Sequence, residues 1–111
     1  GKLCVLVWHY HDDDLPGPKA DVTLRVVGLP DSVTSVLLAH HRIDAEHSNA
    51  HGLWQRMGIT AKPLPEEIEQ LEAAGRLAML GRPANIAVTN ACTLVRFDLP
   101  RQAVSLLVFE W

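Results

Sequence analysis

Long apolar segments are missing from this 111-residue sequence. Its two longest apolar runs cover positions 3–8 and 104–109, whereas a membrane-spanning helix needs about 20 apolar residues. Clusters of Lys and Arg are missing too, and the formal net charge is −3. Nucleic acids and anionic membranes both attract clustered basic side chains. We therefore expect neither a nucleic acid nor a membrane among the partners of this chain.

Cysteine is also scarce. Cys4 and Cys92 are too few for a disulfide scaffold, and they can pair only if their strands are neighbours. Apolar or β-prone residues flank both positions, which predicts buried free thiols. The sequence has no C-x-x-C pair, no serine in a nucleophile-elbow motif and no glycine-rich phosphate loop. The residues by themselves therefore offer no catalytic constellation.

The composition that is present is that of a globular protein. Apolar residues make up 48% of the chain and charged residues 21%, which excludes a disordered, collagen-like or coiled-coil protein. A mass of 12.3 kDa leaves room for one domain and excludes a catalytic barrel of about 250 residues. We therefore predict that residues 1–111 form a single domain.

The first part of the chain carries the pattern of three strands. Positions 3–10 are rich in Val, Leu and aromatic residues and lead into the loop sequence DDDLPGP. Positions 21–28 alternate apolar and mostly polar residues, as a half-buried strand does. A third strand is predicted over 35–43. Its inward set is either Val36, Leu38 and His40 or the opposite set of Leu37, Ala39 and His41, and the sequence does not choose between them.

The middle of the chain, about 44–80, has few β-branched residues and predicts two short helices. Asp44 or Ser48 can cap the first helix, which ends at Gly58. The second helix begins at Pro65, which suits a first turn, and ends at Gly75. Positions 76–80 fit either a last helical turn or an extended segment. The two helices carry apolar residues at helical spacing, namely Leu53, Trp54 and Met57, and then Ile68, Leu71 and Ala74.

The β pattern returns at positions 86–89, 93–99 and 104–111. Short turns separate these segments, so a parallel sheet built from alternating strands and helices is not expected. The predicted fold is mainly β, an antiparallel β-sandwich with two short helices inserted between the third and fourth strands.

Histidine is abundant between positions 40 and 51. His47 and His51 are four residues apart, so on a helix they would face one side and could begin a metal site, with Asp44 or Glu46 as a further ligand. No third ligand is fixed by the sequence. The simpler interpretation is a polar corner in which Asp44 and Ser48 cap a helix and the histidines form hydrogen bonds. We accordingly predict no metal and no cofactor.

The segment HYHDDD, positions 9–14, is the second polar cluster. On an extended strand His9 and His11 lie on one side, and Trp8 and Tyr10 lie on the other. The three adjacent carboxylates that follow repel one another, so the segment is either docked on Arg or on backbone amides or is a solvated loop. Exposed aromatic rings can stack on sugars, but for Trp54 and Trp111 core packing is the simpler expectation. The four candidate rings are Trp8, Tyr10, Trp54 and Trp111.

Five segments together make the sequence recognisable: YHDDDLPGP, VTLRVVGLP, HHRIDAEHSNAHGLWQRMG, LEAAGRL and LPRQAVSLLVFEW. The chain resembles the carboxy-terminal part of bacterial β-xylosidases of glycoside hydrolase family 39, over nearly its whole length. Three sites depart from the family pattern: His9 stands in place of Asn, His51 in place of Tyr, and Ile59 and Thr60 in place of Ser-Pro. α-L-Iduronidases share the architecture of the family.

The resemblance implies a division of labour. In the family a (β/α)₈ barrel carries the two catalytic glutamates, and the sandwich packs on that barrel. The acid/base glutamate of the family lies in an Asn-Glu-Pro context, and the dipeptide Asn-Glu does not occur in this sequence. The resemblance thus implies no catalytic residue in this chain, a barrel of the same polypeptide as its partner, and a parent enzyme that releases xylose from xylo-oligosaccharides without a cofactor. It also implies a cytoplasmic parent and leaves its oligomeric state open, a homo-oligomer included.

We also predict which part of this chain contacts the barrel. The two polar loops that match the family best are HYHDDD and AEHSN. The predicted contact residues are His9, His11, Asp12, Asp13, Asp14, Glu46, His47, Ser48 and Asn49.

Overall fold

The structure is a computed structural model that describes residues 1–59 and 61–111. Thr60, one of the departures noted above, lies outside the described residues. The described elements are, in chain order, β1 (Lys2–Trp8), β2 (Ala20–Val27), β3 (Ser35–Ile43), α1 (Ala50–Met57), α2 (Pro65–Gly75), β4 (Ala78–Met79), β5 (Ala84–Ala87), β6 (Cys92–Leu99) and β7 (Val104–Glu110).

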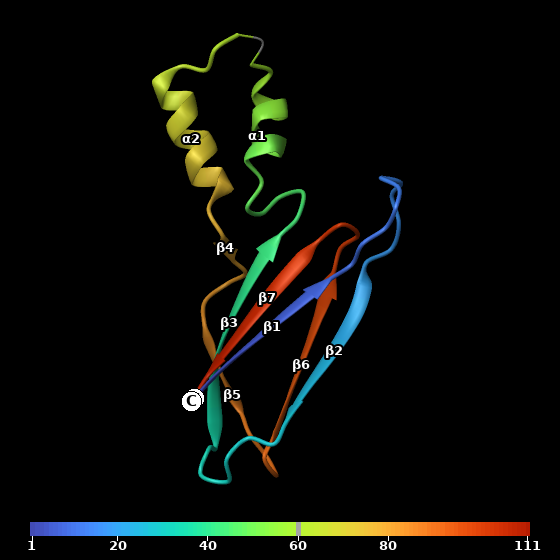
Figure 1. Cartoon of the computed structure of the whole chain (residues 1–111), viewed down its shortest axis with the longest axis vertical. Helices are drawn as coiled ribbons and strands as arrows, with labels where there is room; N and C mark the ends of the chain where they lie inside the picture. The colour runs from blue at the N-terminus through green and yellow to red at the C-terminus, as the bar shows by residue number, and fades with distance from the viewer. Residues whose placement is uncertain (60) are drawn as a thin grey trace.

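The strands form two antiparallel sheets that face each other (Figure 1). In the larger sheet β7 lies between β1 and β3, and β3 also pairs with the short strands β4 and β5. The smaller sheet consists of β2 and β6. This arrangement confirms the predicted antiparallel β-sandwich with helices inserted after the third strand. The two-residue strand β4 resolves the ambiguity of positions 76–80 in favour of an extended segment.

The core lies between the two sheets. Strand β3 has the predicted bounds, and its inward set is Val36, Leu38 and His40, because Val36 and Leu38 are buried in the core between the sheets. The choice of parity follows from pairing, since Leu38 lies opposite the fully buried Phe109. The buried apolar residues of the core are Val26, Leu29, Val36, Leu38, Leu107 and Phe109.

The helices begin and end close to the predicted positions, but the first helix has a different cap. Gly58 ends α1 in the left-handed conformation with φ of 63°, and Pro65 opens α2. The N-cap of α1 is Asn49, whose side chain accepts a hydrogen bond from the Gly52 N–H at 2.8 Å. The prediction of Asp44 or Ser48 is wrong because both side chains bond to backbone groups outside the helix.

Two expectations about buried side chains are also wrong. Cys4 is exposed, because it lies on the outward face of β1, while Cys92 is half-buried, and both thiols are free. Trp54 is 42% exposed and Trp111 37% exposed, so neither ring is enclosed in a core. Trp54 is exposed because it lies on α1, which packs against α2, and neither helix has a buried residue.

The molecule is extended rather than round. The helical hairpin projects from one end of the sandwich (Figure 1), and the overall dimensions are 58 × 31 × 16 Å. The radius of gyration is 17.5 Å, against about 13 Å for a compact domain of this length. The accessible surface is 7660 Å², against about 6,100 Å² for a typical monomer of this mass. The chain therefore leaves much more surface uncovered than a self-contained domain does.

A buried polar chain crosses the interior beside the apolar core. The hydroxyl of Ser105, which is fully buried, accepts a hydrogen bond from Arg42 Nε at 2.9 Å and lies 2.8 Å from His40 Nε2. Because the hydroxyl accepts from Arg42, its own proton is free to be donated to a neutral His40. Arg42 continues the chain by donating to the Asp98 carbonyl at 2.8 Å. Burial lowers the pKa of His40, and the nearby charges of Arg42 and His41 lower it further.

This lowered pKa predicts that acid weakens the fold. The unfolded chain binds a proton at His40 near the ordinary pKa of about 6.5, while the folded chain resists that proton to a lower pH. The stability from His40 is thus complete above about pH 6.5 and falls as the pH drops below that value. We expect His40→Asn to show a smaller loss of unfolding free energy than the wild type between pH 7.5 and 5.5 in urea titrations. Equal losses in the two proteins would contradict this account.

Candidate functional site

Three loops meet at the end of the sandwich from which the helices project (Figure 1). They are the β1–β2 loop, the β3–α1 loop and the turn between β6 and β7. A shared hollow of about 660 Å³ is lined by residues 14–17 and 19, 43–45, 48–49 and 100–102. The two segments predicted to contact the barrel therefore lie at one end of the molecule, joined by the β6–β7 turn. We call this end the loop end.

The β6–β7 turn holds the β1–β2 loop. The amide of Gln102 donates to the carbonyls of His11 at 2.6 Å and Asp13 at 2.8 Å, and its oxygen accepts from the His11 N–H at 3.3 Å. Arg101 forms an ion pair with Asp13 at 2.9 Å, and the same carboxylate accepts from the Leu15 N–H. Of the alternatives left open by the sequence, a loop docked on Arg and backbone amides is therefore correct for Asp13.

His9 and His11 form a hydrogen-bonded pair within this loop. His9 Nδ1 lies 3.0 Å from the carbonyl oxygen of Leu99, and the Nε2 atoms of the two rings lie 2.8 Å apart. A carbonyl only accepts, so the partners assign the proton of His9 to Nδ1 and leave its Nε2 to accept from His11. The two rings meet edge to face, with centroids 4.7 Å apart. The prediction that both histidines lie on one side of the chain is confirmed.

The β3–α1 loop is held by Asp44. Its carboxylate accepts from the backbone N–H groups of Glu46 and His47 and from His47 Nδ1 at 2.8 Å, and it lies 3.5 Å from the Arg42 guanidinium. Burial opposes the ionisation of Asp44, but the hydrogen bonds from Glu46 and His47 outweigh it and hold its pKa below the ordinary value. A catalytic acid of a glycosidase needs a raised pKa, so Asp44 does not have the character of such an acid. Its hydrogen bonds instead hold the loop in shape.

Ser48 ties the same loop to two strands. Its hydroxyl donates to the Arg42 carbonyl at 2.7 Å and accepts from the Ala78 N–H at 2.7 Å. The backbone of Ser48 is left-handed, with φ of 54°, a conformation that a residue with a side chain adopts only when its surroundings hold it there. The strand β4 is therefore fixed to β3 partly through this one hydroxyl.

The nine predicted contact residues fall into two groups. Six of them have side-chain or loop hydrogen bonds within the chain, and these are His9, His11, Asp13, His47, Ser48 and Asn49. In the described part of the chain, the carboxylates of Asp12, Asp14 and Glu46 form no hydrogen bond and no ion pair. These three charges alone of the nine are left to meet another surface.

The geometry does not support a metal at the histidines. His47 precedes α1, so the four-residue spacing to His51 does not lie on one helix, and His51 stacks on Trp54 at 5.7 Å between centroids. Residues 1–59 and 61–111 contain no group of three or more His, Cys, Asp or Glu side chains that could hold a metal ion. No helix in these two ranges is long and apolar enough to cross a membrane.

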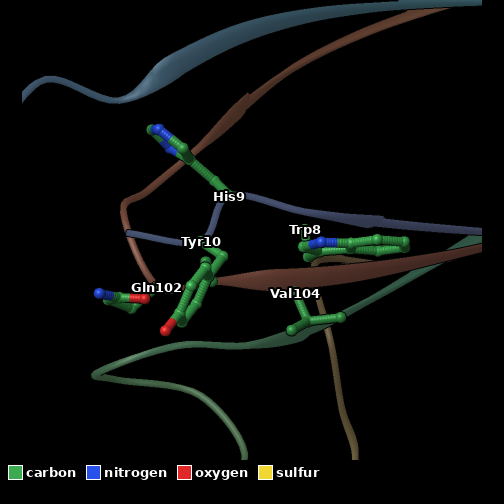
Figure 2. Close-up of a pocket in the computed structure, with 6 residues that line it drawn as sticks. Trp8, His9, Tyr10, Gln102 and Val104 are labelled. Atoms are coloured by element: carbon green, nitrogen blue, oxygen red, sulfur yellow. The ribbon is translucent and has the colours of Figure 1, made fainter. Parts of the chain in front are cut away.

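A second, apolar hollow of about 310 Å³ lies where β1 leaves the sandwich, lined by residues 8–10 and 102–104. Trp8 is 64% exposed and Tyr10 is 69% exposed. Figure 2 shows the Trp8 ring beside Val104 and the Tyr10 ring near Gln102, while His9 points the other way. The polar atoms of His9 and Gln102 are already hydrogen-bonded within the chain.

Reasoning from the sequence named Asp44 and Ser48 but missed Arg42, Arg101 and Gln102, which organise the loop end with them. Arg101 and Gln102 were available as a signal, since they belong to the matched segment LPRQ. Arg42 gave no signal, because a buried arginine in a strand is recognised only once Ser105 and Asp44 are seen around it.

The fold was compared with known proteins. No protein-family model and no curated protein sequence matches the chain. Among solved structures, the GH39 enzyme from Xanthomonas axonopodis pv. citri matches 98% of this chain with a TM-score of 0.82 and 18% identity. A monomeric β-xylosidase from Caulobacter crescentus CB15 matches 98% with a TM-score of 0.75 and 16% identity. A bacterial orthologue of human α-L-iduronidase matches 99% with a TM-score of 0.79 and 19% identity.

The chain spans only 24%, 24% and 20% of the lengths of these three structures. Almost the whole chain is thus matched, each time by a small part of a larger protein. The resemblance stated from the sequence is confirmed at the level of the fold: this chain has the fold of one part of glycoside hydrolases of family 39 and of proteins similar to them.

Proposed function

We propose that this chain is the accessory β-sandwich of a glycoside hydrolase of family 39, and that the parent is a retaining β-xylosidase. The observation that carries the proposal is the match of 98% of this chain to 24% of a GH39 enzyme. The matched sequence segments, such as RIDAEHSNAHGLWQRMG, favour the same family. On this proposal the catalytic glutamates lie on a (β/α)₈ barrel formed by the rest of the polypeptide, and this chain packs on that barrel and stabilises it.

The chemistry of the loop end supports a structural role for this chain. A retaining glycosidase needs two carboxyl groups about 5 Å apart, one of them with a raised pKa. At the loop end Asp13 is neutralised by Arg101, and the pKa of Asp44 is lowered by its donors despite burial. Because its pKa is lowered, Asp44 is not available as a proton donor near neutral pH.

The first test is the activity of the parent polypeptide. We expect the parent to hydrolyse an aryl β-D-xyloside with retention of configuration, and the 111-residue chain alone to hydrolyse none. An aryl α-L-iduronide is the comparison substrate, because one of the similar structures is an orthologue of α-L-iduronidase. Hydrolysis of the iduronide in place of the xyloside would replace the xylosidase proposal with an iduronidase-like one. Activity in neither assay would contradict both.

The loop end is proposed to contact the barrel through its free charges. Asp12 and Asp14 suit a test because their carboxylates make no hydrogen bond or ion pair in the described part of this chain. We expect the double variant Asp12→Ala, Asp14→Ala to lower the melting temperature of the parent by about 1 °C, corresponding to about 1 kcal/mol in a polypeptide four to five times as long as this chain. Arg101→Ala is unsuitable as a probe of the contact, because Arg101 pairs with Asp13 inside the chain. An unchanged melting temperature and unchanged activity would contradict a contact at these charges.

An independent carbohydrate-binding module is the second candidate, favoured by the exposure of Trp8 and Tyr10 beside one hollow. Stacking on a sugar ring would change tryptophan fluorescence. Because His9 and Gln102 already use their polar atoms, few groups are left to bind sugar hydroxyls. We therefore expect no saturable change on titration of the 111-residue chain with xylo-oligosaccharides. A saturable change that Trp8→Ala abolishes would favour the binding module.

A further inference from the structure

The larger sheet has a second face that looks away from the core, and we call it the outer face. Its side chains come from alternate positions of β1, β3 and β7 and from β4. At one end of the sheet the face carries Lys2, Ser35 and Glu110, with Asn85 and Ala87 of β5 beside them. Its other side chains are Cys4, Leu6, Trp8, Leu37, Ala39, His41, Ile43, Met79, Val104, Leu106 and Val108. Leu6 is 56% exposed, Ile43 45% and Met79 41%. Large apolar side chains are thus open to solvent on this face.

The register shows that these side chains form one continuous surface. Residues directly opposite each other on paired strands have neighbouring side chains on the same face. Three successive rows cross the sheet, and they contain Trp8, Val104 and Ile43; then Leu6, Leu106, His41 and Met79; then Cys4, Val108 and Ala39. Only the next row carries charges, where Lys2 pairs with Glu110 at 2.8 Å. His41 is the one strongly polar residue among the three rows.

The smaller sheet provides an internal comparison. Its outer face is formed by the alternate positions of β2 and β6, and most of its side chains are polar or charged. These residues are Asp21, Thr23, Arg25, Val27, Cys92, Leu94, Arg96 and Asp98. Antiparallel sheets that meet water on one side alternate apolar and polar residues in this way. The strands of the larger sheet carry apolar side chains on both faces, which is typical of strands that are covered on both sides.

The amount of uncovered surface agrees with this difference. The accessible surface exceeds that of a typical monomer of this mass by about 1,600 Å². An interface between domains of one chain buries about 600–1,500 Å². The three similar structures are four to five times the length of this chain, so a parent of their size has ample chain to cover the face.

We infer that the outer face of the larger sheet is the main docking surface for the barrel of the parent polypeptide. The inference rests on the proposed function for the identity of the partner. The partner surface is apolar and carries few charges, as the rows from Trp8 to Cys4 require, and the loop end with its free carboxylates lies at the rim. Docking also covers the hollow beside Trp8 and Tyr10, which continues the first row.

The two cysteines of the chain are built-in reporters on the two outer faces. Cys4 is exposed in the third row of the larger sheet, whereas Cys92 lies half-buried on the smaller sheet with its sulfur 3.3 Å from Arg25 Nε. The chain by itself predicts faster alkylation of Cys4. In the native parent we expect the order to reverse, with Cys4 labelled about tenfold more slowly than Cys92 by N-ethylmaleimide, each rate being referred to the urea-unfolded parent. Faster labelling of Cys4 in the native parent would overturn the inference.

A pair of matched variants tests the energetics. Leu6 is 56% exposed on the outer face of the larger sheet, and Leu94 is 47% exposed on that of the smaller sheet. We expect Leu6→Lys to lower the melting temperature of the parent by at least about 4 °C, because docking would bury the lysine charge. Leu94→Lys is the control and stays within about 1 °C of the wild type. Equal shifts for the two variants would overturn the inference.

These experiments separate the docking surface from the proposed function. If the parent has xylosidase activity and Cys4 is freely labelled, the proposed function stands and the docking surface is overturned. If the parent has no glycosidase activity but Cys4 is protected, the proposed function is overturned, while a covered outer face is supported. Protection of Cys4 that disappears as the parent is diluted would show a second copy on this face and overturn docking of the barrel.

Discussion

The central strand β7 constrains the whole structure, because it pairs on both edges and carries apolar side chains on both faces. Leu107 and Phe109 point into the sandwich and are fully buried. Leu106 and Val108 point the other way, where residues 1–59 and 61–111 provide no second layer. A sheet with two apolar faces needs two covers, and the smaller sheet supplies only one. The uncovered face adds to the large accessible surface of the chain.

The loop end is built from side chains that satisfy one another. Gln102 binds two carbonyls of the β1–β2 loop, Asp44 closes the β3–α1 loop, and Ser48 joins that loop to β4. Polar loops are often assumed to be the contacts of a domain, yet most of these side chains are already committed to holding their own backbone. A partner would therefore meet a preformed edge with a few free carboxylates and, beside it, a broad apolar face.

The helical hairpin shows the same dependence on surroundings. Helices α1 and α2 contact each other but bury none of their residues, and Ile68 is 40% exposed. Short helices gain most of their stability from tertiary packing of an apolar face. The hairpin therefore has good local signals, such as Gly58 and Pro65, and little packing of its own. Both the sheet and the hairpin have the character of parts of a larger assembly, which agrees with the short span of the chain relative to the similar structures.

Local signals in the sequence determined the elements. Richness in β-prone residues, alternation at positions 21–28 and the turns between segments predicted the strands. The bounds of β3 agree residue for residue, because residue preferences and turn residues are local properties. Gly58 marked the end of α1, and Pro65 marked the start of α2. Both residues act through their own backbone angles, which are local properties. The matched segments gave the resemblance that the fold then confirmed.

Only the tertiary structure decided what depends on contacts between distant residues. The inward set of β3 was undetermined until Leu38 was seen opposite Phe109, because both sets of side chains are mainly apolar. The cap of α1 is Asn49 because Asp44 and Ser48 bind backbone groups elsewhere. The outer face emerges only when β1, β3 and β7 lie in register, since each strand by itself is merely rich in apolar residues. Sequence thus determines which side chains alternate along a strand, whereas pairing across the sheet determines which surface they build together.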